Sequence, residues 1–182
     1  MNEKILYTLD RVGTLSSGAH IQLQDAIYHN NKLQEHQTER FWQQVSRHGN
    51  NYFFNPHINL TNAPEKLSIF IEMLLEERRK ACFPNKPSRF QSLFACTTIR
   101  DAAWFRGSSR SPLSTPIYEV LTTTNCHKAD MNLLNVNCSP IEFSHRMELY
   151  WKGETKELYQ GYEPFWEVLV PLPAMIGNRV QE

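Results

Sequence analysis

One carboxylate in this chain stands where it could do chemistry. Glu167 directly precedes Val168, Leu169 and Val170, an aliphatic run typical of a buried strand. A carboxylate at this position is either a solvated residue at the strand end or an anion held rigidly beside a cleft. An anion of the second kind stabilises a cationic transition state, such as the one formed when a glycosidic bond breaks. The local sequence alone leaves both interpretations open.

The distribution of charge is a second functional signal. The chain has no net charge, yet residues 78–110 hold eight basic residues and one acidic residue, Asp101. A basic segment in an otherwise acidic chain indicates an anionic ligand such as a phosphate, a dinucleotide or a nucleic acid. The alternative is a solvated helix end followed by a loop. The basic residues are Arg78, Arg79, Lys80, Lys86, Arg89, Arg100, Arg106 and Arg110.

The cysteines and histidines form no recognised metal or redox motif. The four cysteines include no CxxC pair, which favours reduced and mostly buried thiols over a disulfide scaffold. Cys126, His127 and Cys138 have intervals that match no standard zinc site, and a fourth ligand is missing. We therefore expect no metal.

Length and composition are those of one ordinary folded domain. The 182 residues are 41% hydrophobic and 21% charged, without internal repeats, so a single domain over residues 1–182 is expected. No apolar run approaches the roughly 18 residues that span a bilayer, and the run after Lys4 is too short for a signal peptide. We predict a cytoplasmic protein, unless it is exported by a route that leaves no mark in this sequence.

The elements that position these residues fall into two groups. A helical portion is predicted over about residues 36–82, and a sheet core over about residues 3–23 and 88–180. In the helical portion, a first helix starts at Thr38 and stops at Gly49. The second helix carries one apolar face, made of Leu67, Phe70, Ile71, Leu74 and Leu75.

The sheet core is predicted from short strands interrupted by two capped helices. Thr98 caps the first helix, and Ser139 with Pro140 starts the second, which ends at Gly153. This order predicts an α+β fold with a mostly antiparallel sheet. Strands are expected at residues 3–9, 91–96, 117–121, 166–172 and 174–180.

Two of these segments together resemble the ADP-ribosyltransferase fold, which poly-ADP-ribose polymerases and diphtheria-type toxins share. The first, "SLFACTTIRDAAWF", resembles the central signature, in which a short aromatic strand leads into an Ala-rich helix. The second, "FWEVLVPLPAMIGNRV", is similar to the last motif, in which a Glu opens an aliphatic strand. The wider layout also looks like a bacterial branch of that fold. The resemblance implies a split, mostly antiparallel sheet around an NAD cleft, with a helical insertion in the first half.

The resemblance also implies roles for individual residues. Glu167 matches the catalytic Glu that hydrogen-bonds the ribose 2′-hydroxyl and stabilises an oxocarbenium-like transition state. Ser92 matches the Ser that shapes the nicotinamide-ribose pocket, and Phe105 matches an aromatic residue that stacks on nicotinamide. Arg89, three residues before Ser92, is a candidate for the pyrophosphate because a guanidinium binds phosphate oxygens bidentately.

The first strand departs from the family pattern. Where the family carries a His or Arg that holds the dinucleotide, this chain has Tyr7, with Arg11 a turn later, and both are candidate NAD ligands. Members that modify arginine place a Glu two residues before the catalytic one. Here that residue is Phe165, which disfavours an arginine acceptor.

The resulting hypothesis is an NAD-dependent ADP-ribosyltransferase that releases nicotinamide and modifies a protein or nucleic acid. NAD would be consumed as a substrate, and a toxin-like enzyme of this kind would imply a neutralising protein partner. An NAD glycohydrolase of the same fold is the first alternative. The second is a non-catalytic module that binds nucleic acid or protein through the basic segment.

Overall fold

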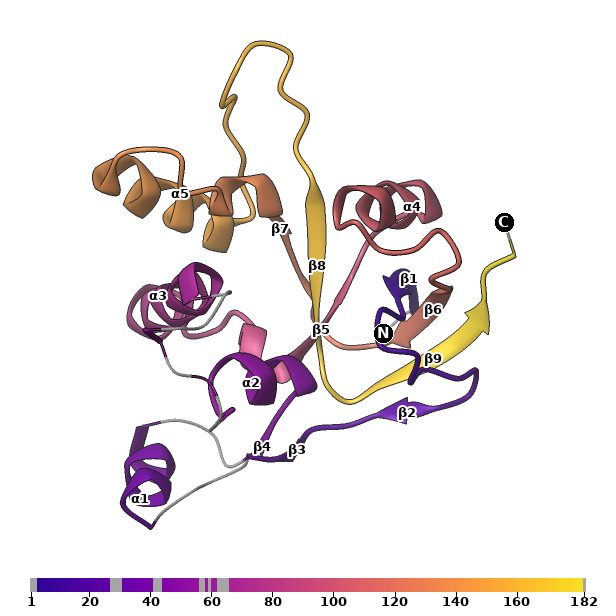
Figure 1. Cartoon of the computed structure of the whole chain (residues 1–182), viewed down its shortest axis with the longest axis horizontal. Helices are drawn as coiled ribbons and strands as arrows, with labels where there is room; N and C mark the ends of the chain where they lie inside the picture. The colour runs from indigo at the N-terminus through magenta and orange to yellow at the C-terminus, as the bar shows by residue number, and fades with distance from the viewer. Residues whose placement is uncertain are drawn as a thin grey trace.

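The computed structural model describes residues 3–26, 31–40, 44–55, 58, 60–61 and 66–181. Within them it shows two antiparallel sheets of four and three strands with helices packed against them, and a separate two-stranded antiparallel sheet (Figure 1). The predicted α+β class with mostly antiparallel strands is therefore confirmed. None of the helices within these residues is long and apolar enough to cross a membrane.

The larger sheet has four strands in the order β1-β6-β9-β2. Its strands are β1 (Lys4–Leu9), β6 (Ile117–Thr122), β9 (Ala174–Arg179) and β2 (His20–Ile21), and each neighbouring pair is antiparallel. Leu6, Val120 and Ile176 are buried on one face of this sheet, where they pack with aliphatic residues of the smaller sheet. The shared core therefore ties the two sheets together.

The smaller sheet places β8 (Trp166–Pro171) between β5 (Ser92–Ala95) and β7 (His127–Asp130). Side chains alternate across a strand. Val168 and Val170 accordingly join the core shared with the larger sheet, whereas Leu169 packs on the opposite side with Tyr150 of α5 (Pro140–Lys152). The same alternation puts Glu167 on the Leu169 side, facing the helices.

The two sheets meet between β1 and β5. Tyr7 and Cys96 exchange two backbone hydrogen bonds across this junction, with N···O distances of 2.9 and 2.7 Å. Beyond its last residue β8 turns directly into β9, so that one continuous segment contributes a strand to each sheet (Figure 1). The two sheets are thus separate hydrogen-bonded ladders that are joined by this bridge and by their shared apolar core.

Two helices begin where local sequence predicts. The Thr98 hydroxyl accepts from the Asp101 N–H at the start of α4 (Ile99–Ser108), and the Ser139 hydroxyl accepts from the Glu142 N–H at the start of α5. Gly153 ends α5 in the left-handed conformation, with a φ of 76°. These caps are confirmed because each depends on residues close together in the chain.

The predicted buried face of α3 (Lys66–Cys82) is right for Leu75, which is fully buried, and for Ile71, which packs against the core, but it is wrong for the other three residues. Leu67, Phe70 and Leu74 are about half exposed, whereas Glu72 and Glu76 are buried. The reason is that both carboxylates face basic side chains in the interior, Glu72 binding Arg89 and Glu76 binding Arg79. Buried ion pairs, rather than the apolar stripe, set the rotation of this helix.

The helix predicted from Thr38 to Gly49 is replaced by three elements. Thr38 falls within α1 (Asn31–Arg40), β4 (Gln44–Val45) pairs with β3 (Gln24–Asp25), and residues 41–43 lie outside the described residues. Ser46 caps a separate helix, α2 (Arg47–Tyr52). Gly49 lies inside α2 rather than ending it. A Cβ at this position would come within 2.6 Å of the Phe90 carbonyl oxygen, so the glycine allows α2 to approach the backbone of η1 closely.

The central strand predicts a large stability difference between two leucines. Leu169 is fully buried in β8, whereas Leu113 is 81% exposed. Leu169→Ala is expected to lower the free energy of unfolding by about 3 kcal/mol, because it removes buried methyl groups and leaves a cavity. The matched Leu113→Ala variant should change it by less than about 0.5 kcal/mol. Urea denaturation followed by circular dichroism measures both, and equal losses would contradict this packing.

Candidate active site

A cavity of about 610 Å³ lies where β1 and β5 meet, with further walls from α2, α3, α4 and β8. This volume is within the usual range for small-molecule sites. The structure brings all six sequence-predicted site residues to the wall of this one cavity. They are Tyr7, Arg11, Arg89, Ser92, Phe105 and Glu167.

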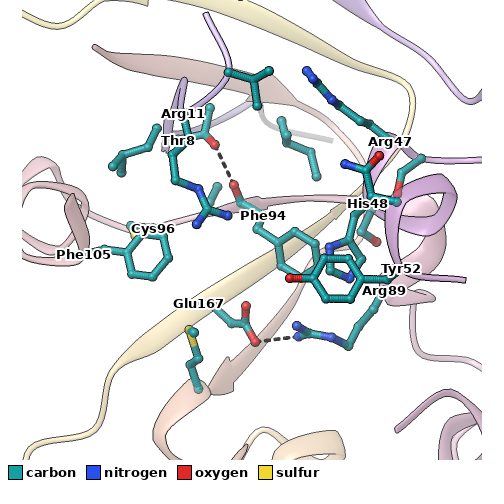
Figure 2. Close-up of a pocket in the computed structure, with 18 of the residues that line it drawn as sticks. Thr8, Arg11, Arg47, His48, Tyr52, Arg89, Phe94, Cys96, Phe105 and Glu167 are labelled. Carbon is teal, nitrogen blue, oxygen red and sulfur yellow. Dashed lines mark hydrogen bonds and ion pairs between the residues drawn. The ribbon is translucent and has the colours of Figure 1, made fainter. Parts of the chain in front are cut away.

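Glu167 lies at the cavity floor, at the second position of β8, and is 6% exposed. Its Oε1 accepts from Arg89 Nη1 at 2.6 Å (Figure 2). The same oxygen accepts from the Tyr150 hydroxyl at 2.8 Å. Among the described residues, none donates to Oε2. One carboxylate oxygen is therefore fixed by two donors, and the other is available to a ligand.

Arg89 is the residue that holds this carboxylate. It lies in the short 3-10 helix η1 (Arg89–Gln91) and is 5% exposed. Its Nε and Nη2 donate to the two Glu72 oxygens at 2.7 and 2.8 Å, and Nη1 donates to Glu167 and to the Tyr150 hydroxyl oxygen. The Phe94 ring lies 4.6 Å from its guanidinium carbon. All three guanidinium nitrogens are thus engaged inside the protein, and binding of pyrophosphate by Arg89 stays a prediction.

The protonation states of this cluster follow from burial and charge. Burial by itself would lower the pKa of Arg89, but Glu167 and Glu72 raise it well above its ordinary value. Burial would likewise raise the pKa of Glu72, but Arg89 and His48 overcome that effect and hold it well below its usual range. Burial raises the pKa of Tyr150, opposed by Arg89 and reinforced by Glu167, so its hydroxyl stays protonated. Glu72 is therefore an anion and Arg89 a cation at neutral pH.

Tyr150 is positioned by the packing behind it. His127 on β7 places Nε2 2.9 Å from the Tyr150 carbonyl oxygen, and its ring stacks on Trp151 at a centroid distance of 5.6 Å. Burial, together with the charges of Lys86 and Arg89, lowers the pKa of His127 to about 4, against the effect of its bond to Tyr150. A neutral imidazole that donates to this carbonyl therefore anchors the end of α5.

Asp130 orders the loop that leads into β8. This fully buried carboxylate accepts from the Phe165 N–H at 3.0 Å and from the Asn132 N–H at 3.1 Å. The hydroxyls of Thr155 and Tyr162, both in the loop before β8, also donate to it. The backbone of Phe165, two residues before Glu167, is thus held in place by Asp130.

Arg11 reaches the cavity from the turn after β1. Asp10, 7% exposed, accepts from the Thr14 and Leu15 N–H groups, both at 3.0 Å, and Gly13 has the positive φ of 72° that this turn needs. The Arg11 guanidinium carbon lies 5.6 Å from the centre of the Phe105 ring. Within the described part of the chain, Arg11 forms no ion pair, in contrast to Arg89.

Aromatic rings form the apolar end of the cavity. Phe105 of α4 stacks on Phe165 with ring centroids 5.4 Å apart, and Phe165 also contacts Trp104 at 4.7 Å. Phe105 and Phe165 line the cavity together with Met131. The residue predicted to disfavour an arginine acceptor, Phe165, is thus part of the aromatic wall.

Ser92 and Tyr7 have structural contacts in the cavity wall. Ser92 is 1% exposed, and its hydroxyl donates to the Ser88 carbonyl oxygen at 2.7 Å, which fixes η1 against β5. Tyr7 forms the bridge to Cys96. Their predicted contacts with nicotinamide riboside and dinucleotide stay predictions.

Sequence reasoning missed the side of the cavity built by α2 and α3. Arg47 donates to the Thr14 hydroxyl at 2.9 Å, and His48 lies 3.3 Å from Glu72 Oε1. Figure 2 shows Arg47, His48 and Tyr52 on the side of the cavity opposite Phe105. A signal for Glu72 was present, because Glu72 and Glu76 stand four residues apart amid apolar residues of a helix. No local pattern marked Arg47 or His48.

Comparison with known proteins gives one family. The family model described as "Protein of unknown function (DUF2441)" matches residues 6–171, which include every residue of the cluster around Arg89. No curated protein matches the chain.

His127 predicts a loss of stability in acid. An ordinary histidine takes up a proton near pH 6.5, whereas folded His127 does so only near pH 4. Between these values the unfolded chain binds the additional proton, so the stability contributed above pH 6.5 is lost as the pH falls toward 4. From pH 7 to 4.5, the wild type should lose on the order of 2 kcal/mol more unfolding free energy than His127→Gln.

Urea titrations of both proteins at the two pH values measure this difference. Other acid-sensitive groups, Glu72 among them, are present in both proteins and cancel. Parallel declines in the two proteins would show that His127 does not carry the effect.

Proposed function

Because the match covers most of the chain, the chain belongs to the DUF2441 family, and from the geometry of its cavity we propose that it is an NAD-dependent ADP-ribosyltransferase. It would release nicotinamide and transfer ADP-ribose to a protein or nucleic acid. One observation carries the proposal: Glu167 is a buried carboxylate with one oxygen fixed by two donors and the other free, in a cavity lined by every residue that the ADP-ribosyltransferase resemblance named.

The chemistry requires an anion beside the ribose. When the bond between C1′ and the nicotinamide nitrogen breaks, its electron pair leaves with nicotinamide and the positive charge moves to the ribose. The free Glu167 oxygen would accept a hydrogen bond from the ribose 2′-hydroxyl and stabilise that charge. A nucleophile of the acceptor then attacks C1′ and loses a proton. Preorganised electrostatic stabilisation of this kind contributes several kcal/mol.

The balance of charge around Glu167 favours this role. Arg89 alone would neutralise Glu167, but Glu72 supplies a second negative charge to the same guanidinium. Two carboxylates, Glu72 and Glu167, thus face the single guanidinium of Arg89, so the formal charge of these three side chains is minus one. A developing cation on the ribose would therefore meet a net anionic surface that is already held in place.

The remaining walls suit the other parts of the dinucleotide. Phe105 and the adjoining Phe165 offer an aromatic surface on which nicotinamide would stack. We assign the pyrophosphate to Arg11 and Arg47 rather than Arg89, because both line the cavity and neither forms an ion pair among the described residues. The Thr14 hydroxyl, bound to Arg47, would add a donor.

The arrangement of the sheets also supports the proposal. The resemblance implied a split sheet around a cleft, and here two antiparallel ladders diverge from the Tyr7–Cys96 bridge beside the cavity. The alternative of a module that binds nucleic acid through the basic segment has less support. Arg78, Arg79 and Lys80 each pair with a carboxylate, which reduces the positive charge presented to a partner.

Glu167→Gln is expected to reduce nicotinamide release from NAD at least about 100-fold, because the amide keeps the shape of the side chain but removes the negative charge. The matched variant Glu163→Gln changes an exposed carboxylate four residues earlier and should keep wild-type activity. Circular dichroism and unfolding curves establish that both variants are folded.

The assay uses NAD labelled in its adenosine part, with whole-cell extract as the source of acceptor. Protease and nuclease digestion then shows which macromolecule carries the label, and free ADP-ribose alone would instead favour a glycohydrolase. The proposal fails if the wild type releases no nicotinamide with any extract or nucleic acid.

Arg11→Ala and Arg47→Ala are each expected to weaken NAD binding about tenfold, because each removes a charge-assisted hydrogen bond to phosphate. Isothermal titration calorimetry with NAD measures the dissociation constants. Arg100→Ala, which changes an exposed arginine of α4, is the matched control. Affinity unchanged in both cavity variants would remove these two residues from the pyrophosphate site.

A further inference from the structure

The cluster around Glu167 extends one residue beyond the groups that the proposed reaction uses. Glu167 binds Arg89, Arg89 binds both oxygens of Glu72, and Glu72 Oε1 lies 3.3 Å from Nε2 of His48. These four side chains come from β8, η1, α3 and α2. The chain of contacts therefore links the cavity floor to the opposite wall.

His48 is held firmly at the end of this chain. Its ring stacks on Tyr52 at 4.5 Å and meets the edge of Phe94 at 4.7 Å. Glu72 from α3 contacts it, Tyr52 from its own helix stacks on it, and Arg89 from η1 binds the same carboxylate. Arg47 is its neighbour in α2. Phe90 and Phe94 complete its surroundings. The imidazole thus has one carboxylate contact and little freedom to leave it.

We propose that His48 and Glu72 are positioning residues that act through Arg89 on Glu167, and that protonation of His48 slows cleavage of the nicotinamide bond. This inference rests on the proposed function. It adds a pH-dependent control of the same site.

Two physical effects give the direction. The first is competition, because His48 Nε2 and Arg89 Nη2 approach the same oxygen of Glu72. A protonated imidazole would draw Glu72 from Arg89, and the guanidinium would then be neutralised more completely by Glu167. The second is net charge, since a proton on His48 changes the sum over the four groups from minus one to zero. Both effects weaken the stabilisation of a cationic ribose.

The maximal rate of nicotinamide release tests this inference across pH 5 to 8, the range in which imidazole ordinarily changes its charge. In the wild type, kcat is expected to fall about three- to tenfold toward pH 5 through a step that His48→Gln lacks. Glutamine does not titrate, so whatever the substitution does to the rate should be the same at pH 8 and at pH 5. His145→Gln, at an exposed position of α5, should keep the step.

The effect is expected in kcat, with KM for NAD nearly unchanged. A change confined to KM would mean that His48 contacts the substrate directly, which overturns a positioning role. An identical acid step in wild type and His48→Gln overturns the inference but leaves the proposed function intact.

A second measurement does not depend on activity. The C–H resonances of the His48 ring, assigned by comparison with His48→Gln, give its titration midpoint by NMR. If Glu167 and His48 are coupled electrostatically through Arg89 and Glu72, Glu167→Gln should lower that midpoint. The reason is that Arg89 loses a neutralising carboxylate and its positive charge then opposes protonation of His48. Glu163→Gln should leave it in place. An unmoved midpoint in Glu167→Gln refutes the coupling even if the wild type proves inactive, so the two failures are distinguishable.

Discussion

The buried guanidinium of Arg89 is the constraint on which the site depends. A cation removed from water is costly unless anions and hydrogen-bond acceptors replace the solvent on every side. Here Glu72, Glu167 and Tyr150 supply them from three elements that are far apart in the sequence. Removing one partner of such a cluster typically costs about 3–5 kcal/mol, so the position of Glu167 and the stability of the fold are linked.

This constraint also explains which parts of the fold could be predicted from sequence. The caps at Thr98 and Ser139 and the strand after Glu167 depend on neighbours within a few residues, and they were predicted with their boundaries nearly right. Glu167 and Phe105 lie in the two motifs that together resemble a known family, and Arg11 follows the first strand, where that family carries a His or Arg. The structure places these residues at one cavity, although their roles stay predictions.

The orientation of α3 and the role of Gly49 could not be predicted from local patterns, because contacts with residues distant in the sequence determine them. The apolar residues of α3 predicted a face with Leu67 and Leu74 inside, but Glu72 must face Arg89, seventeen residues later, and this turns the leucines outward. Gly49 resembled a helix stop, yet it allows a backbone contact with Phe90. In both cases a single long-range contact outweighed a valid local preference.

The same reasoning changes the meaning of the basic segment. Counted along the sequence, residues 78–110 carry a large positive excess, which suggested a surface for anions. In the fold, Arg79, Arg89 and Arg106 are buried, and each donates to carboxylate or carbonyl oxygens inside the protein. A buried arginine that donates to acceptors inside the protein stabilises the structure around the site and is not available to bind an anionic ligand. In the proposed function the pyrophosphate is therefore assigned to two arginines outside that segment, Arg11 and Arg47. Both line the cavity without an acidic partner among the described residues.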